Sequence, residues 1–106
     1  MSKPYVYHPE ARKEYDEAGI FIEGDRPGYG ELFWDMVDKA IDLICEKPGL
    51  FPQKHNGVRF CYLGMFRYNI VYLEREQDVV ILAIAHTSRK PHYWSQRLKS
   101  ILSKIN

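Results

Sequence analysis

The chain has 106 residues, of which 45% are hydrophobic and 27% charged, and its formal net charge is +1. These values are ordinary for a folded protein, so they exclude a disordered chain and a collagen-like repeat, and the length predicts a single domain over residues 1–106. The charge is unevenly distributed. Residues 1–53 carry six Lys and Arg against eleven Asp and Glu, whereas residues 54–106 carry nine against three. The second half is therefore basic, but its candidates for contact with a partner are Arg67, Arg89 and Lys90, which are too few for a dedicated nucleic-acid binder.

Neither membrane insertion nor secretion is indicated. The longest apolar run, Val79–Ala85, is much shorter than the ~18 residues that a membrane helix needs. The first ten residues lack the apolar segment of a signal peptide, so we expect a cytoplasmic protein with no membrane partner. Two cysteines, Cys45 and Cys61, are too few for a disulfide framework. We expect both to be reduced and buried.

The first half predicts a short strand and two helices. Tyr5–Tyr7 is the strand, and Pro9 suits the first turn of the following helix because its missing N–H needs no partner there. The apolar face of this first helix consists of Ala11, Tyr15, Ala18 and Ile22. The second helix carries a continuous apolar stripe of Leu32, Phe33, Met36, Val37, Ala40, Ile41 and Ile44.

The second half predicts three strands and a final helix. The strands are Val58–Leu63, Phe66–Glu74 and Val79–His86, and Gly64-Met65 fits a two-residue hairpin turn. Pro91 is expected to open the last helix, whose apolar positions are Trp94, Leu98, Ile101, Leu102 and Ile105. The order β-α-α-β-β-β-α predicts an α+β fold, an antiparallel sheet with the helical hairpin on one face and a C-terminal helix.

The hairpin turn also predicts which side chains share a face. If Leu63 pairs with Phe66, then Cys61 pairs with Tyr68, on an apolar face that should lie under the two helices. Arg59 falls on this face, so we expect a structural arginine bound to a carboxylate or to loop carbonyls. The opposite face is expected to contact a partner, and it carries Phe60, Tyr62, Arg67, Asn69, Val71 and Leu73.

Three segments resemble the RelE/ParE toxin superfamily. Residues 86–94, HTSRKPHYW, follow an apolar strand and match the pattern His-x-x-Arg-x-Pro-x-x-Trp that members often carry. Residues 7–11, YHPEA, resemble the opening of the family, and residues 57–59 with 66–72 resemble its central hairpin. The resemblance implies the same β-α-α-β-β-β-α fold. It also implies the toxin of a type II toxin–antitoxin module, in the ParE-like or plasmid stabilisation subgroup.

The superfamily divides by target: ParE-like members poison DNA gyrase, and RelE-like members cut messenger RNA on the ribosome. RelE-like nucleases take catalytic groups from alternate positions of the first hairpin strand and from an arginine after the aromatic residue of the second. Here those positions hold Phe60, Tyr62 and Asn69, which are neither bases near neutral pH nor cations. We therefore expect a non-catalytic gyrase inhibitor, and keep a metal-independent endoribonuclease as the alternative.

Each of the two possible targets implies its own set of site residues. If the protein is a ribonuclease, the catalytic residues are His86, Arg67, Arg89 and Tyr93. The target-binding residues are Arg67, Asn69, Arg89, Lys90, Tyr93 and Trp94. Histidine is the natural acid or base because its reference pKa of about 6.5 lies near physiological pH, but His86 also fits a hydrogen-bonding cap at the end of the strand. Tyr93 and Trp94 also fit as packing anchors.

No metal or other cofactor is expected. His86 and His92 lack the spacing of metal ligands on a helix, and His8 and His55 lie on separate loops. The expected partners are a cognate antitoxin and DNA gyrase, or the ribosome and its message under the alternative. The chain would then form a homodimer or a hetero-oligomer with the antitoxin. The stripe of Leu98, Ile101, Leu102 and Ile105 is either core or the cover of a groove shared with that antitoxin.

Overall fold

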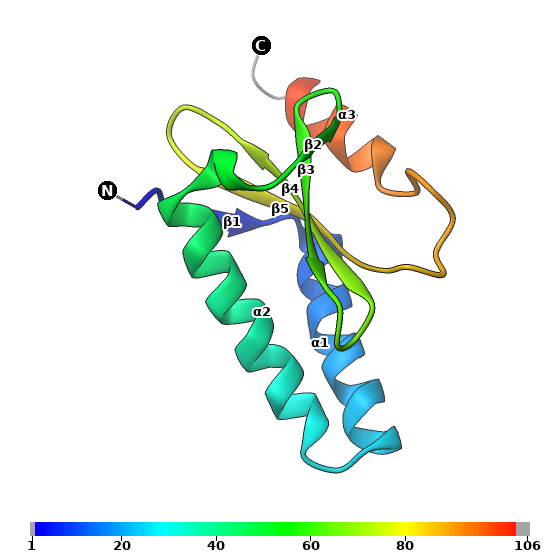
Figure 1. Cartoon of the computed structure of the whole chain (residues 1–106). Helices are drawn as coiled ribbons and strands as arrows, with labels where there is room; N and C mark the ends of the chain where they lie inside the picture. The colour runs from blue at the N-terminus through cyan, green and yellow to red at the C-terminus, as the bar shows by residue number, and fades with distance from the viewer. Residues whose placement is uncertain (1, 104–106) are drawn as a thin grey trace.

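The computed structural model describes residues 2–103, a five-stranded sheet with helices on both sides (Figure 1). Its elements are β1 (Tyr5–Tyr7), α1 (Pro9–Asp25), α2 (Tyr29–Glu46), the 3-10 turn η1 (Pro48–Leu50), β2 (Gln53–His55), β3 (Val58–Leu63), β4 (Tyr68–Glu74), β5 (Val79–His86) and α3 (Ser95–Ser103). The predicted α+β class and order of elements are confirmed. The structure adds η1 and β2, and Ile105 lies outside the described residues. None of the helices in the described part is long and apolar enough to cross a membrane.

The strands lie in the order β1-β5-β4-β3-β2. All neighbours are antiparallel except β1 and β5, which run parallel with Tyr5 opposite Val79 and Tyr7 opposite Ile81. β5 is therefore an inner strand, and its residues Val79–Ala85 are buried. Burial on both faces explains why this strand reads as a continuous apolar run rather than an alternating one.

The β3–β4 hairpin has a longer connection than the sequence predicted. Leu63 pairs with Tyr68 and Cys61 with Ile70, so residues 64–67 form the turn. Arg67 has φ +58°, a left-handed conformation that places it in the turn rather than in β4. The predicted pairing of Leu63 with Phe66 is wrong by two residues. Because side chains alternate with a period of two, this even shift leaves every strand residue on its predicted face.

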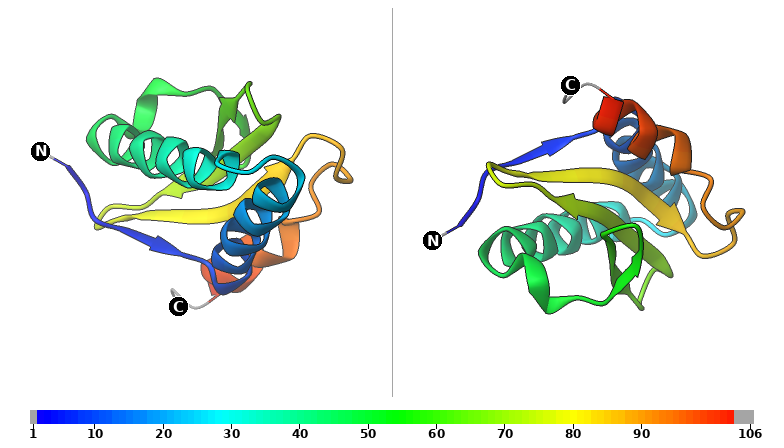
Figure 2. Two further views of the ribbon diagram at one scale, coloured as in Figure 1. Left: turned by 90° about the horizontal axis from the view of Figure 1, so that it is seen from below. Right: turned by 90° about the horizontal axis from the view of Figure 1, so that it is seen from above.

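Two apolar cores lie on the two faces of the sheet, with α2 on one side and α3 on the other (Figure 2). The core under α1 and α2 includes Phe33, Ile41, Ile44, Cys61 and Tyr72. The core under α3 includes Val58, Val71, Leu82, Ala83, Trp94 and Leu98. A register shift opposite Val71 and Tyr72 lets Leu82 and Ala83 both face α3. Cys45 and Cys61 are free thiols and buried, as predicted.

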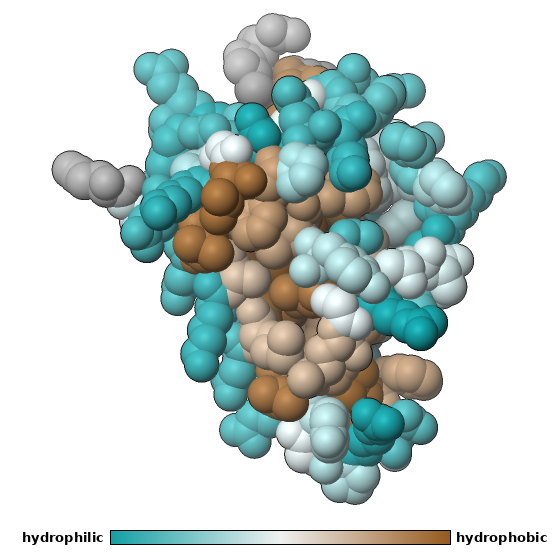
Figure 3. Space-filling model, viewed as in Figure 1, coloured by the Kyte–Doolittle hydropathy of each residue, from teal (hydrophilic) through white to brown (hydrophobic). Residues whose placement is uncertain are grey.

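The apolar stripe of α2 is divided between the core and the surface. Phe33, Val37, Ile41 and Ile44 are fully buried. The neighbouring row consists of Leu32, Met36, Ala40 and Leu43, of which Met36 and Ala40 are half-buried and Leu32 and Leu43 are 39% and 38% exposed. We call this row the α2 strip. Figure 3 shows apolar side chains gathered between α2 and the β3–β4 hairpin on this face.

The C-terminal helix begins later than the sequence predicted. Pro91 was expected to open it, but residues 91–94 form turns, with His92 at φ +61°, and α3 begins at Ser95. The backbone N–H of Ser95 donates to the carbonyl of His92 at 2.9 Å. Leu98 is buried, Ile101 is half-buried against the same core, and Leu102 is 49% exposed.

Helices α1 and α2 approach each other closely at glycines. A Cβ at Gly19 would overlap the indole of Trp34, and one at Gly30 would overlap the backbone carbonyl oxygen of Gly19. The indole cannot easily move away, because its Nε1 donates to the carbonyl oxygen of Tyr15 at 2.8 Å. Gly19 is thus required by packing, whereas Gly24 on the same helix is exposed and has open space around its Cβ position.

We expect the two glycines to respond in opposite ways to alanine. Gly19→Ala should lower the free energy of unfolding by about 2 kcal/mol through overpacking. Gly24→Ala should raise it by about 0.5–1 kcal/mol, because alanine favours an exposed helical position. Urea unfolding of both variants measures this. Equal unfolding midpoints would show that α1 and α2 can move apart to fit a Cβ at Gly19 without loss of stability.

Candidate functional site

The edge of β5 beyond β1 is covered by two charged side chains. β1 pairs only with Val79–Ile81, so the next residues of β5 have no neighbouring strand on that side. Glu14 of α1 accepts a hydrogen bond from the backbone N–H of Ile84 at 3.1 Å. Arg97 of α3 donates to the carbonyl oxygen of Leu82 at 2.9 Å. Backbone groups that would otherwise be unpaired at the edge therefore have charged partners.

Glu14 is the centre of a wider network, the Glu14 cluster, which consists of Glu14, Tyr93 and Arg97. Its carboxylate accepts from the Tyr93 hydroxyl at 2.8 Å and from both terminal nitrogens of Arg97 at 2.9 and 2.8 Å. The side chains of Glu14 and Arg97 are each only 14% exposed. This two-pronged geometry is the strong form of an arginine–carboxylate pair.

The surroundings of Tyr93 and Arg97 raise the pKa of both side chains. Burial raises the pKa of Tyr93, and its hydrogen bond to Glu14 raises it further, so the hydroxyl keeps its proton. For Arg97, burial lowers the pKa, but the hydrogen bond and charge of Glu14 outweigh burial and the net shift is upward. The Tyr93 hydroxyl therefore stays protonated and donates its hydrogen bond to Glu14.

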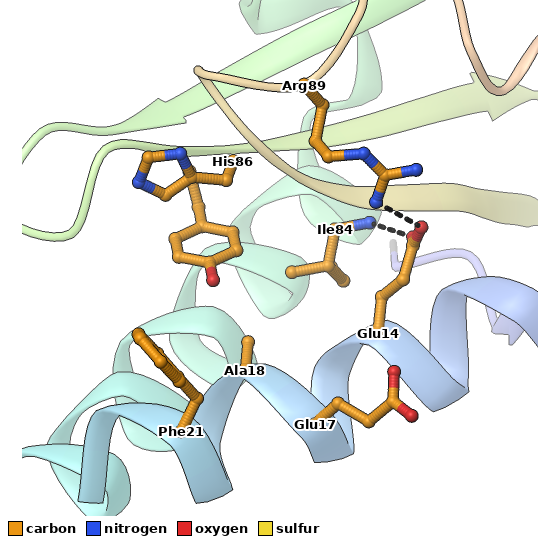
Figure 4. A pocket seen from close by; sticks show the side chains of 8 residues that line it. Glu14, Glu17, Ala18, Phe21, Ile84, His86 and Arg89 are labelled. Carbon is orange, nitrogen blue, oxygen red and sulfur yellow. Dashed lines mark hydrogen bonds and ion pairs between the residues drawn. The ribbon is translucent and has the colours of Figure 1, made fainter. Parts of the chain in front are cut away.

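Arg89 lies beside this cluster, and Figure 4 shows its guanidinium directed toward Glu14. Its guanidinium carbon lies 3.9 Å from the centre of the Tyr93 ring, and its Nη1 lies 4.0 Å from Oε2 of Glu14. The side chain is nevertheless 53% exposed. Stacking on an aromatic face restrains an arginine without removing its hydrogen-bond donors. Arg89 is therefore a restrained cation available to a partner.

His86 caps the turn that follows β5, as one of the two sequence interpretations expected. Its Nδ1 accepts from the backbone N–H of Ser88 at 3.1 Å and lies 2.8 Å from the Ser88 hydroxyl. The ring packs edge-on against Tyr68, with 5.0 Å between ring centres. Because His86 is opposite Tyr68 in register, its side chain points to the α1–α2 side of the sheet.

Open hollows lie on both sides of the 86–94 segment. One, of about 210 Å³, lies against α1 and is lined by Glu14, Glu17, Ala18, Phe21, Tyr68, Ile84, His86 and Arg89 (Figure 4). A second, of about 180 Å³, lies between residues 85–94 and the side chains of Phe60 and Asn69. A third, of about 540 Å³, is lined by Phe51, Pro52, Lys54, Phe60, Tyr62 and Asn69. The second and third hollows share Phe60 and Asn69, and we call the two together the β3 groove.

The predicted site residues are only partly brought together. The second hollow brings six of them together, because it is lined by Asn69, His86, Arg89, Lys90, Tyr93 and Trp94. Arg67 is exposed in the β3–β4 turn. Its carbonyl oxygen accepts a hydrogen bond from the backbone N–H of Thr87 at 2.9 Å. This bond links the turn to the loop after β5 that carries Arg89 and Lys90, which we call the basic loop.

Two aromatic and basic residues have structural positions. Trp94 is 2% exposed and packs edge-on against Phe60, with 5.9 Å between ring centres. The packing-anchor interpretation of Trp94 is confirmed, and its burial removes it from the exposed residues that can reach a target. Arg59 donates to the carbonyl oxygen of Phe51 at 2.7 Å, so its predicted structural role is also confirmed.

Sequence reasoning missed Glu14 and Arg97. Glu14 lies among Ala11, Tyr15 and Ala18 on the apolar face of α1, and Arg97 lies next to Leu98 on the apolar side of α3. The position of a charged residue on an apolar helix face could have identified both, because a charged group that is buried needs a partner. Helical periodicity alone does not indicate which of the charged side chains meet in the fold.

The prediction that the histidines lie apart is wrong for one pair. His55 and His92 contact each other, with ring centres 4.9 Å apart and an interplanar angle of 71°. The left-handed backbone at Asn56, Gly57 and His92 turns both loops toward this contact. Within residues 2–103, no cluster of three or more His, Cys, Asp or Glu side chains could hold a metal ion.

The Glu14 cluster generates a stability prediction. Glu14→Gln should lower the free energy of unfolding by about 2 kcal/mol, because Arg97 loses its charged partner in a largely buried position. Glu17→Gln is the matched control, since Glu17 is one turn further along α1 and exposed. Urea unfolding at neutral pH measures both. If the two variants unfold at the same midpoint, the Glu14 cluster does not support the fold.

A family comparison agrees with this architecture. The family model described as the ParE toxin of a type II toxin–antitoxin system, parDE, matches residues 5–91. The match extends from β1 to the basic loop and includes Glu14, His86 and Arg89. No curated protein matches the chain.

Proposed function

Because the chain belongs to the ParE toxin family, and is thus the toxin of a type II toxin–antitoxin system with a cognate antitoxin as partner, we propose that it inhibits DNA gyrase. In this proposal it acts in the cytoplasm as a binding protein without catalysis of its own. An exposed basic surface contacts gyrase, and the antitoxin prevents that contact.

The engagement of the titratable groups within the protein supports a binding role. Cleavage of RNA without a metal needs a base and an acid on opposite sides of one phosphate. His86 and Tyr93 line the same hollow as Asn69, but the Nδ1 of His86 accepts a hydrogen bond from the backbone N–H of Ser88. The Tyr93 hydroxyl donates to Glu14, and the pKa of Tyr93 is raised by burial and by that bond. Both candidate groups thus already have partners within the protein.

The basic residues at this end of the sheet form the proposed contact with gyrase. Arg89 and Lys90 are exposed in the loop after β5, and Arg67 is exposed in the neighbouring turn. The hydrogen bond from Thr87 to the Arg67 carbonyl oxygen keeps the two segments together. Complementary charge mainly accelerates and orients association, so an acidic surface on gyrase is the expected counterpart.

A supercoiling assay with purified gyrase tests this proposal. The toxin should block supercoiling and accumulate cleaved DNA, and the double variant Arg67→Glu/Arg89→Glu should need about tenfold more protein for the same effect. The matched control is Lys13→Glu/Lys39→Glu, which reverses two exposed charges on α1 and α2. Normal supercoiling at a large excess of folded toxin would rule out gyrase as the target.

The ribosome-dependent endoribonuclease is kept as a second candidate because Asn69, Arg89 and Lys90 line one groove. A cationic groove of this kind could hold messenger RNA for cleavage. Primer extension on ribosome-bound message, with the toxin and with His86→Ala, tests it. Cleavage that His86→Ala abolishes would favour this candidate over gyrase inhibition, and intact message would dismiss it.

We place the antitoxin on the α2 strip. Leu32 and Leu43 are more than a third exposed there, and Leu50 and Met65 are 57% and 64% exposed. Figure 3 shows this apolar surface continuing toward the β3–β4 hairpin. Exposed apolar surface of this kind is typical of a protein–protein interaction site, which fits a hetero-oligomer of toxin and antitoxin.

A further inference from the structure

The hollow on the α1 side of the 86–94 segment has an apolar end and a charged end. Figure 4 shows Phe21 on one side of it and the charged groups of Glu17 and Arg89 on the other. The ring of Phe21 is 73% exposed, and the buried residues Ala18 and Ile84 add further apolar lining. The volume of about 210 Å³ is below the ~300 Å³ at which pockets for drug-sized ligands begin. The hollow therefore suits a small ligand with one apolar and one charged end.

Two opposite charges of this hollow are available to a ligand. Glu14 is not one of them, because both terminal nitrogens of Arg97 already bind its carboxylate. Glu17 is exposed, and within residues 2–103 its side chain has no hydrogen-bond or ion-pair partner. Arg89 is 53% exposed, and its contact with Glu14 is long, at 4.0 Å. The hollow thus contains one available anion and one available cation, whereas no described residue lining the β3 groove is an aspartate or glutamate.

Tyr68 adds a second ring and a hydrogen-bond donor to this lining. Its ring packs edge-on against His86, with 5.0 Å between ring centres, and the side chain is half-buried. The hydroxyl has no hydrogen-bond partner in the described part of the chain. Burial and the charge of Glu14 raise the pKa of Tyr68, so the hydroxyl keeps its proton near neutral pH. A ligand in the hollow therefore meets two aromatic rings, a proton donor, a cation and an anion.

An α-amino acid with an apolar side chain matches this set of groups. Its carboxylate pairs with the guanidinium of Arg89, which suits carboxylates in particular, and its ammonium group pairs with Glu17. Its side chain covers the exposed ring of Phe21 and removes apolar surface from water. A simple carboxylic acid would leave Glu17 unpaired, and an amine would leave Arg89 unpaired. A nucleotide would bring phosphates next to two carboxylates, and like charges in contact repel.

We propose that the hollow between α1 and the 86–94 segment binds a free α-amino acid with an apolar side chain, such as phenylalanine or leucine. Arg89 and the Tyr68 hydroxyl bind its carboxylate, Glu17 binds its ammonium group, and Phe21 and Ile84 contact its side chain. The proposal goes beyond gyrase inhibition, because it concerns a small molecule rather than a protein target. It also concerns the α1 side of the segment rather than the β3 groove.

An NMR titration of the nitrogen-15-labelled full chain with L-phenylalanine tests the proposal without gyrase. For a ligand this small we expect a dissociation constant on the order of 1 mM. The backbone N–H signals of Glu17, Phe21 and Ile84 should shift together and reach saturation. Three analogues each remove one feature of the ligand: N-acetyl-L-phenylalanine lacks the ammonium group, L-phenylalaninamide lacks the carboxylate, and L-serine lacks the apolar side chain. Each should bind at least about fivefold more weakly than L-phenylalanine.

Paired variants assign the binding to this hollow. Arg89→Gln, Glu17→Gln and Phe21→Ala should each weaken the binding of L-phenylalanine at least about fivefold. The control for Arg89 is Lys90→Gln, because Lys90 is the next residue of the basic loop but lines only the β3 groove. The control for Phe21 is Ile20→Ala, because Ile20 is 65% exposed on the same helix and does not line the hollow. Urea unfolding midpoints confirm that each variant is folded.

Several outcomes would overturn the proposal: no saturable shifts with L-phenylalanine, equal binding of L-serine, or equal effects of Arg89→Gln and Lys90→Gln. Equal or tighter binding of N-acetyl-L-phenylalanine would also overturn it, because this analogue resembles the C-terminal residue of a protein and would identify a protein partner as the occupant. The result is independent of the gyrase assay. Failure to bind the amino acid together with inhibition of supercoiling would remove this inference and leave the proposed function intact. Binding without any effect on gyrase would do the reverse.

Discussion

The carboxylate of Glu14 joins parts of the chain that are far apart in sequence. Its hydrogen-bond partners Ile84, Tyr93 and Arg97 lie 70, 79 and 83 residues away. Through these contacts one side chain of α1 covers the open edge of β5, fixes the ring of Tyr93 and holds α3 against the sheet. Arg89 stacks on that ring, so the direction of this exposed cation depends on a carboxylate that is itself only 14% exposed. A charge buried this far is tolerated only because every partner is present.

The 86–94 segment joins the two sides of the sheet. One face carries Tyr68 toward the α1–α2 hairpin, and the other carries Phe60, Tyr62 and Asn69 toward the region beside α3. His86 and Arg89 line hollows on both sides. The Tyr93 hydroxyl is bound to Glu14 and the His86 Nδ1 to the backbone N–H of Ser88. The outcome is an exposed surface rich in cations and rings, which supports the proposed binding role.

Local patterns predicted local structure well, and long-range contacts poorly. Val58–Leu63 and Val79–His86 were predicted with the bounds that the structure shows, because β-rich runs bounded by turn residues define strands. The faces of β3 and β4 were also correct, since an even register error preserves alternation, but the turn and therefore the position of Arg67 were wrong. Glu14 and the contact between His55 and His92 could not be predicted. Their partners are brought close only by the tertiary fold, and periodicity carries no information about which side chains meet.

The distance in sequence between Glu14 and its partners also affects the order of folding. Contacts between distant residues form late, and a chain emerges from the ribosome with its N-terminus first. α1 and α2 are neighbours in sequence and can pack on each other early. The edge of β5, the Tyr93 ring and Arg89 reach their final positions only after residue 97 has been made. An antitoxin that binds the α2 strip therefore meets its site on the growing toxin before any target can meet the completed basic loop.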